Sequence, residues 1–429
     1  MKLDSVEWKQ AARNLLRNKR RSLITGLAIM AGFTGLAVFG GYVGRVERYC
    51  MVNTVYINHM GHIQVHLKEG LNRYFSKPAR YLIDPANVQA LVELLSDNKE
   101  VEFFSPYLMA NGLLQYESDS FAFQGKGITR DSDKFVREHP MVKKWNAELR
   151  EITDGIPLAD ASTNPEDPSP VKITFKLSNF LKNQKDINMQ GLTVDNAFNA
   201  IDAKVVARYT TGFEMTEDTS MMTLLPAFQN LMATDGITYM GVYLNNDMKA
   251  RSVSGELNKE FAKHSLPLEA VPFFDERIGL FYTGSMNFLY AITAFFFLLV
   301  SVVVILSVAN AISMNIMERV KELGTMRAIG FTPEHLARLI AMESFILAII
   351  ATVVGFVVAQ ILAVITNAAN VRFSPPGIAG DIQFVITPWP LLCLFFAIPL
   401  IIFAVVTAYI VTKRKLKGEV AHLLIETST

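Results

Sequence analysis

The sequence predicts an α-helical membrane protein with four transmembrane helices and a large mixed α/β (α+β) extracytoplasmic domain inserted between helices one and two. Three observations predict this class. Hydrophobic residues make up 51% of the 429 residues and charged residues only 19%, which is too apolar for an ordinary soluble protein. Four long stretches contain no charged residue, and Lys and Arg gather in short segments that flank them.

Each uncharged stretch is long enough to cross a bilayer, since a spanning helix needs about 20 mostly apolar residues. The stretches are Ser22–Gly44, Ile278–Met317, Ser344–Val371 and Ile382–Thr412. Buried helices of a soluble fold fail on length, because they rarely stay uncharged beyond about 14 residues. A signal peptide is the alternative for the first stretch. Its apolar part exceeds about 15 residues and no Ala-x-Ala site follows, so we interpret it as a retained helix.

The cations orient the chain, because Lys and Arg are enriched in short cytoplasmic segments. Seven precede the first span, four lie between spans two and three, and four follow span four. Both termini and the 316–338 loop are therefore predicted to lie inside, and segment 45–282 outside. That segment has 25 basic and 31 acidic residues, and the rest of the chain has 16 basic and 9 acidic. The basic inner rim suits anionic lipid, so we do not predict nucleic-acid binding.

The predicted organisation follows from these spans. In chain order it comprises an amphipathic cytoplasmic helix (1–21), the first span (22–44), the extracytoplasmic domain (45–282), the second span (283–315), a cytoplasmic coupling helix and turn (316–338), the third span (339–366), a short outer loop (367–387), the fourth span (388–412) and a cytoplasmic tail (413–429). The cytoplasmic pieces are too short to fold alone. A receptor with a cytoplasmic output domain is therefore disfavoured.

The outer segment reads as alternating strands and helices. Asp84-Pro85 predicts an N-cap with proline at the first helical position, opening a helix to about Ser96. Asn111-Gly112 is typical of a hairpin turn. The remaining expected elements are strands at Gly61–Leu67, Phe103–Leu108, Leu113–Tyr116, Phe121–Gln124, Lys204–Tyr209 and Thr238–Leu244, and helices at Ser220–Ala233 and Asp247–Lys263.

The sequence contains no motif for chemistry on this chain. Gly125-Lys126-Gly127 lacks the spacing of a nucleotide-binding P-loop, so any ATP-driven action must be driven by a separate chain. His59, His62 and His66 are the only histidine cluster. On a strand, His62 and His66 would lie about 13 Å apart, too far to share one zinc ion. We predict solvent-facing histidines, no metal, no cofactor and no catalytic residue.

The most informative stretch is Met314–Leu336, where span two leads into a charged amphipathic helix. Ile316, Val320, Leu323, Met326 and Ile329 recur at helical spacing. Gly330 suits the C′ position of that helix, and Thr332-Pro333 suits the start of the next one. The stretch predicts a structured helix–turn–helix at the inner membrane face. The alternative is an ordered re-entry loop whose charges are merely solvated.

This stretch resembles the signature of the MacB/LolC–LolE/FtsX family of ABC permeases. The matching residues run from Glu318 to Gly324 (ERVKELG) and from Met326 to Gly330 (MRAIG). Residues 12–22 look like the family's amphipathic first helix, and Gly61–Val65 is similar to its first outer strand. The order of one span, a large outer domain and three spans matches the LolC/LolE-type layout without a fused ATPase domain.

The resemblance implies mechanotransmission, in which two permeases, identical or paralogous, pair above two copies of a cytoplasmic ATPase. ATP-driven closure would then pass to the outer domains through the inner helix. Carried over by position, the residues that would form or shape the ATPase contact are Glu318, Arg319, Lys321, Glu322, Gly324, Arg327 and Gly330. The location implied is a bacterial inner membrane, with the large domain in the periplasm.

Several functions remain open within this class. The leading expectation is extraction or export of a lipoprotein or another amphiphilic cargo. The alternatives are a permease that passes a drug or peptide to a periplasmic adaptor, and an FtsX-like signal transmitter that activates a periplasmic partner. The size of the outer domain disfavours the signal transmitter.

Overall fold

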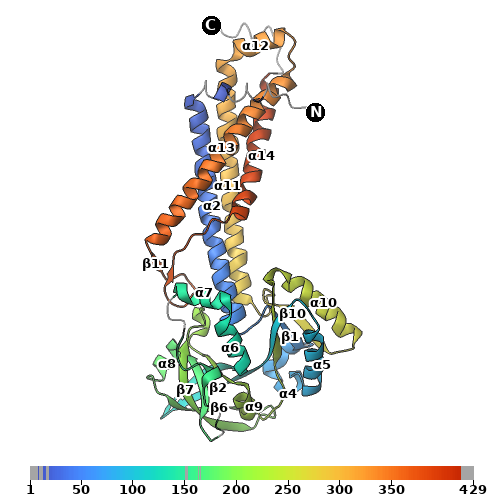
Figure 1. The fold of residues 1–429 in the computed structure, drawn as a ribbon, viewed down its shortest axis with the longest axis vertical. Coiled ribbons are helices and arrows are strands. Elements are labelled where there is room, and N and C mark those ends of the chain that lie inside the picture. Colours follow the sequence, from blue (N-terminus) through green and yellow to red (C-terminus); the bar gives the residue numbers. More distant parts are fainter. Residues whose placement is uncertain are drawn as a thin grey trace. The chain divides into compact units, whose positions relative to one another are not determined.

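The computed structural model describes Trp8 and residues 13–15, 19–149, 153–162, 164 and 166–416 (Figure 1). The chain divides into two compact units. One comprises residues 1–46, 287–371 and 384–429, and the other comprises residues 47–286 and 372–383. The second unit includes part of the segment expected as a short outer loop. Most of the expected amphipathic helix at 1–21 and of the tail at 413–429 lies outside the described residues.

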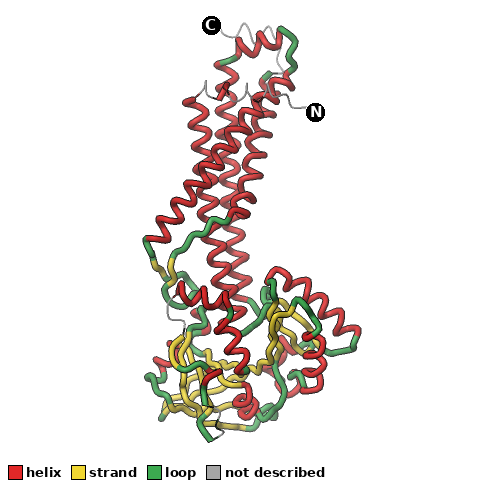
Figure 2. Tube along the Cα trace, viewed as in Figure 1, coloured by secondary structure: helices red, strands yellow, loops and turns green. Residues whose placement is uncertain are grey.

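Four helices in the described residues are long and apolar enough to span a membrane. They are α2 (Lys19–Val52), α11 (Leu280–Glu318), α13 (Pro333–Ala368) and α14 (Pro390–Lys415). Because α2 and α11 are longer than the expected spans at 22–44 and 283–315, each crosses from one unit into the other, at Val46 and at Met286 respectively. The four helices lie in the first unit for most of their length and appear as long red coils in Figure 2.

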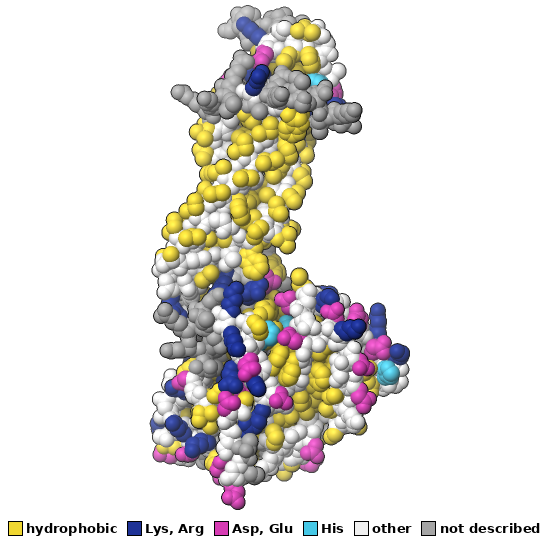
Figure 3. All heavy atoms as spheres, viewed as in Figure 1, with side chains coloured by type: hydrophobic (Ala, Val, Ile, Leu, Met, Phe, Trp, Pro, Cys, Tyr) yellow, Lys and Arg dark blue, Asp and Glu magenta, His cyan; other side chains and the backbone are white. Residues whose placement is uncertain are grey.

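The surface of these helices is apolar where a soluble protein would be polar. Leu306 of α11, Val364 of α13 and Phe395 of α14 are all exposed, and hydrophobic side chains cover this part of the molecule in Figure 3. Charged side chains gather instead on the α/β unit and near the helix ends. Such a surface is stable only when it contacts lipid or another apolar surface.

Small residues let the helices approach closely. A Cβ added to Gly40 would lie 2.8 Å from the Phe396 ring of α14, and one added to Gly355 would lie 2.9 Å from Phe33 of α2. The Thr34 hydroxyl donates to the Gly355 carbonyl over 3.1 Å at the same crossing. Close approach of backbones is what small residues provide in membrane helices.

The second unit is built on a ten-stranded mixed sheet with strand order β10-β1-β9-β2-β3-β8-β5-β7-β4, and β6 pairs with both β2 and β7. The strands are β1 (Ile63–Leu67), β2 (Val101–Tyr116), β3 (Asp119–Ile128), β4 (Thr153–Gly155), β5 (Ser169–Thr174), β6 (Asp186–Leu192), β7 (Phe198–Tyr209), β8 (Ser220–Leu224), β9 (Tyr239–Leu244) and β10 (Leu268–Pro272). A separate pair, β11 (Arg372–Phe373) and β12 (Ile382–Gln383), is antiparallel. The β3–β8 and β5–β7 pairs are parallel, and the other pairs of the large sheet are antiparallel.

Helices cover the sheet of this unit. They are α3 (Gly70–Arg73), α4 (Pro78–Tyr81), α5 (Pro85–Ser96), α6 (Arg130–Glu138), α7 (Pro140–Leu149), α8 (Phe175–Phe180), α9 (Leu225–Met232) and α10 (Ala250–Lys263). Helix α10 packs on β10, and α9 packs on β2 and β3. The predicted start of α5 is confirmed, because the Asp84 carboxylate accepts from the Asn87 amide over 2.8 Å and Pro85 follows it.

Two expected elements of this unit are wrong. Asn111 and Gly112 form no turn, since β2 continues through them to Tyr116 and the chain reverses before Asp119. Gly112 is needed for a different reason, because a Cβ there would lie 2.0 Å from the Gln190 carbonyl oxygen of β6. The helix expected at Ser220–Ala233 begins only at Leu225, after the parallel strand β8.

Candidate coupling site

The inner helix begins with a break. Helix α11 ends at Glu318 and α12 spans Val320–Ala328, with Arg319 between them at φ −104° and ψ 16°. The Arg319 carbonyl still accepts from the Leu323 amide over 2.9 Å, so Arg319 caps the new helix. Helix α11 and the charged helix α12 are therefore separate helices.

The Arg319 side chain is paired with carboxylates and is mostly shielded from solvent. Its guanidinium makes two hydrogen bonds to Glu322, of 2.9 and 3.1 Å, and lies 3.8 Å from a Glu343 oxygen of α13. The side chains of Arg319 and Glu343 are 12% and 7% exposed. Asn14 also donates to Glu343 over 2.6 Å. A buried carboxylate is tolerated when it is paired and hydrogen-bonded, so these contacts fix α12 to α13.

Arg327 makes a second link, to α14. Its guanidinium donates to the Leu416 carbonyl over 2.7 Å, at the end of that helix. Cations near a helix C-terminus satisfy its free carbonyls and oppose its dipole. The Lys413 ammonium lies 3.3 Å from Glu334 and joins α14 to the first turn of α13. The start of α12 is thus linked to α13, and its end to α14.

The turn after α12 has the geometry that its sequence predicts. Gly330 has φ +110°, its amide bonds the Arg327 carbonyl over 3.0 Å, and the Phe331 amide bonds the Met326 carbonyl over 3.1 Å. This is a Schellman motif with glycine at C′. Thr332 then caps α13, because its hydroxyl accepts from the His335 amide over 3.2 Å. The helix–turn–helix expected from Met314–Leu336 is therefore present.

The structure separates the seven residues carried over by resemblance. Glu318, Lys321 and Gly330 are exposed and Gly324 is buried, whereas Arg319, Glu322 and Arg327 are half-buried in the contacts above. The predicted apolar stripe is correct for Ile316 and Leu323, which are buried. It is wrong for Ile329, which is 75% exposed because it lies at the end of α12 beyond the packed turn.

Exposed apolar side chains surround the charges on this element. We define the α12 face as Met317, Lys321, Ala328, Ile329 and Phe331, all exposed. Apolar anchors among a few charged residues are typical of a surface that another protein contacts. Ile329 recurs at the helical spacing of the apolar stripe, but it directly precedes the turn at Gly330 and lies at the end of α12.

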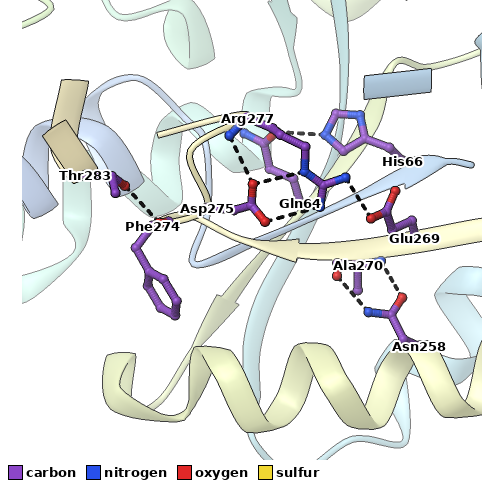
Figure 4. A network of polar contacts seen from close by, with 9 residues as sticks. All are labelled: Gln64, His66, Asn258, Glu269, Ala270, Phe274, Asp275, Arg277 and Thr283. Carbon is purple, nitrogen blue, oxygen red and sulfur yellow. Dashed lines mark hydrogen bonds and ion pairs between the residues drawn. The ribbon is translucent and has the colours of Figure 1, made fainter. Parts of the chain in front are cut away.

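A second network lies in the α/β unit at the start of α11 and was not anticipated from the sequence (Figure 4). Arg277 bonds Asp275 through its Nε, over 3.0 Å, and Glu269 of β10 through a terminal nitrogen, over 2.9 Å. The hydrogen bonds from Arg277 lower the pKa of Asp275. The Thr283 hydroxyl of α11 donates to the Phe274 carbonyl over 2.8 Å. These contacts fix the first turn of α11 to the end of β10.

The histidines do not face solvent, which corrects the expectation. His59, His62 and His66 are all nearly fully buried. His62 Nδ1 accepts from the Leu244 amide over 3.0 Å, and His66 Nε2 contacts Gln64 over 2.8 Å. His66 lies on β1, which is an inner strand paired with β9 and β10, and the other two histidines precede this strand. Burial lowers the pKa of His62 to about 4 and that of His66 to about 3.

The C-terminal part of the chain matches a known protein family. Residues 294–417 match the family "FtsX-like permease C-terminal", a segment that includes α12, α13, α14 and most of α11. The FtsX-like permease resemblance predicted from Met314–Leu336 is thereby confirmed for this segment. No curated protein matches the chain at a significant level.

Two solved structures are similar to part of the chain. One is the extracellular domain of the noncanonic ABC-type transporter YknZ from Gram-positive bacteria, with 11% identity and a TM-score of 0.29 over 46% of this chain and 92% of that chain. The other is the periplasmic region of MacB from Actinobacillus actinomycetemcomitans, with 12% identity and a TM-score of 0.31 over 49% of this chain and 87% of that chain.

Proposed function

We propose that this chain is the membrane-spanning subunit of an ATP-driven ABC transporter that works by mechanotransmission. Separate cytoplasmic ATPase subunits, two copies carrying ATP and Mg²⁺, would contact the α12 face, and their motion would pass through the long helices to the α/β unit. The cargo would be a lipoprotein or another amphiphile that is extracted or exported on the outer side. The match of residues 294–417 to FtsX-like permeases supports the class.

One observation carries the proposal. Helix α12 is joined to α13 through Arg319 and Glu343, and to α14 through Arg327 and Leu416. A force applied to α12 would therefore reach both helices together instead of only bending a loop. Transmission over a distance needs stiff, packed elements of this kind.

The proposed setting follows from the same reading. The chain would lie in a bacterial inner membrane with both termini and α12 in the cytoplasm and the α/β unit in the periplasm, because cations are enriched around α12 and at the end of α14. A second permease, identical or paralogous, would complete the assembly. The four apolar helices expose side chains that a partner helix and lipid would share.

The first test is capture of a partner. Tagged full-length chain is purified from its native membrane in mild detergent, and co-purifying proteins and lipids are identified by mass spectrometry. We expect an ABC ATPase in stoichiometric amount and a co-purifying lipoprotein or other amphiphile. Absence of an ATPase under conditions that retain a known permease–ATPase complex would contradict the proposal. Recovery of a cell-wall hydrolase with the ATPase, and no cargo, would favour the signal transmitter instead.

A further inference from the structure

The α/β unit contains a cavity of about 280 Å³ that the proposed transport mechanism does not use. Its walls come from β2, β3 and β8 on one side, and on the other from residues 54–60 and from the first turn of α11. We define the methionine cavity by Met60, Met109, Met221, Met222, Lys126 and Phe281, which all line it. All its lining residues belong to one compact unit.

The lining is mostly apolar and adaptable. Four methionines lie in the wall, together with aromatic side chains that include Phe213 and Tyr282. Methionine has a flexible, polarisable side chain and is over-represented at surfaces that accept apolar ligands of varied shape. With the liquid volume of one water molecule, about 30 Å³, as a guide for each non-hydrogen atom, the cavity has room for a ligand of about nine or ten such atoms.

Lys126 is the cation in this wall. Its ammonium donates to the Asn58 carbonyl over 2.5 Å, and lies 5.4 Å from the centroid of the Tyr239 ring and 6.0 Å from that of Tyr107. No carboxylate lies within ion-pair distance of it among the residues that the structure describes. Burial lowers the pKa of Lys126 to about 7, since the surroundings disfavour its charge.

Lys126 is half-buried. A cation that has lost much of its water and has no counter-charge is unfavourable, and an anion that enters the same space relieves the cost. One of the three N–H donors of Lys126 is used by the Asn58 carbonyl, so two donors remain for an anion bound in the cavity that Lys126 lines. The charge of Lys126 and the methionine lining therefore complement two different parts of one ligand.

We propose that the methionine cavity binds a small anionic amphiphile of the alkyl carboxylate class. Its carboxylate pairs with the Lys126 ammonium, and its apolar chain lies among Met60, Met109, Met221 and Met222. Because Phe281 and Tyr282 of α11 form part of the wall, an occupied cavity also holds the first turn of that helix. The proposal concerns a ligand of the α/β unit and does not depend on the proposed ATPase partner.

The test uses full-length chain in lipid nanodiscs and labelled octanoate, which has ten non-hydrogen atoms. Equilibrium dialysis measures retention, with empty nanodiscs subtracted for partition into lipid. Octan-1-ol and octylammonium are compared at the same concentration. We expect octanoate to be retained about tenfold more tightly than octan-1-ol, as one charge-assisted contact implies, and octylammonium not to be retained. Equal retention of octanoate and octan-1-ol, or no specific retention of octanoate, would overturn the proposal.

Two lysine variants assign the site. Lys126→Met should reduce octanoate retention to the level of octan-1-ol. Lys172→Met is the matched control, because Lys172 is also a lysine of the α/β unit with a pKa lowered by burial, lies 5.0 Å from the Tyr209 ring and lines a different cavity. Unchanged retention in Lys126→Met, or equal loss in both variants, would contradict the assignment. If Lys126→Met does not fold, the comparison of the three octyl probes on the unmodified chain still tests whether the cavity prefers a carboxylate.

Discussion

The Arg327 guanidinium of α12 donates a 2.7 Å hydrogen bond to the carbonyl of Leu416, at the last turn of α14. The two residues are separated by 89 positions, so the bond joins the inner helix to the end of the final span. If α12 receives the force of an ATPase, this bond is one route by which α14 moves with it. Its loss should therefore affect coupling more than it affects folding.

Substitution of Arg327 tests this route. Arg327→Glu repels the Leu416 carbonyl instead of donating to it and should reduce ATPase stimulation by the permease by up to about tenfold. The thermal unfolding midpoint of the chain in nanodiscs should change little, because Arg327 is only half-buried. Arg338→Glu, which reverses an exposed arginine of α13, is the control. Normal stimulation with Arg327→Glu would remove this residue from the coupling route.

Loss of Arg319 should act on stability as well as on coupling. Arg319→Ala leaves Glu343, whose side chain is 7% exposed, without its cation. Removing one partner of a buried pair is strongly destabilising, so we expect a loss of about 2 kcal/mol in the free energy of unfolding. The double variant Arg319→Met with Glu343→Gln removes both charges and should recover most of that loss. Equal stability of the single and double variants would show that the pair is not energetically coupled.

The left-handed backbone at Gly330 gives a prediction about the turn. With φ at +110°, Gly330→Ala should destabilise the chain by about 1 kcal/mol, because a Cβ disfavours that backbone. Gly255→Ala is the matched control, since Gly255 lies inside α10 with open space around it. There alanine should stabilise the helix slightly. Thermal unfolding of both variants measures the contrast, and equal shifts in both would refute the role of the Schellman turn.

The buried histidines predict acid lability of the α/β unit. The unfolded chain binds a proton at His62 near pH 6.5, whereas the folded unit does so only near pH 4. Stability from this neutral His62 is present above pH 6.5 and is lost as pH falls toward 4. At pH 5 the loss is about 2 kcal/mol. The same direction holds for His66.

Thermal unfolding between pH 7.5 and 5 checks this dependence. His66→Gln should flatten the fall in midpoint, and His264→Gln should not, because the His264 side chain is 51% exposed. A fall of the same slope in His66→Gln and in the unmodified chain would contradict the assigned burial of the neutral ring.

Local signals in the sequence predicted several elements correctly. Asp84-Pro85, Gly330 and Thr332-Pro333 each carry a side chain or a backbone freedom that determines a helix end without help from distant residues. The four apolar stretches predicted the four long helices for a similar reason, since length and hydropathy are local properties.

The features that the sequence analysis missed or predicted wrongly depend on contacts with residues far along the chain. The inward direction of Arg319 requires Glu343, which lies in α13, 24 positions later. Gly112 resembles a turn residue, but its small size serves the approach of β6, which the local sequence does not reveal. The burial of His62 depends on pairing of β1 with strands that lie far along the chain, and the Arg277 network joins residues of no recognised motif.

The central claim is that the α12 face receives the ATPase. The most direct measurement is ATP hydrolysis and co-purification of the ATPase with Ile329→Asp, compared with Leu192→Asp, which makes the same change at an exposed apolar residue of the α/β unit. We predict that Ile329→Asp loses the ATPase and its stimulation, while Leu192→Asp retains both at an unchanged unfolding midpoint. Full ATPase recovery and stimulation with Ile329→Asp would contradict the account.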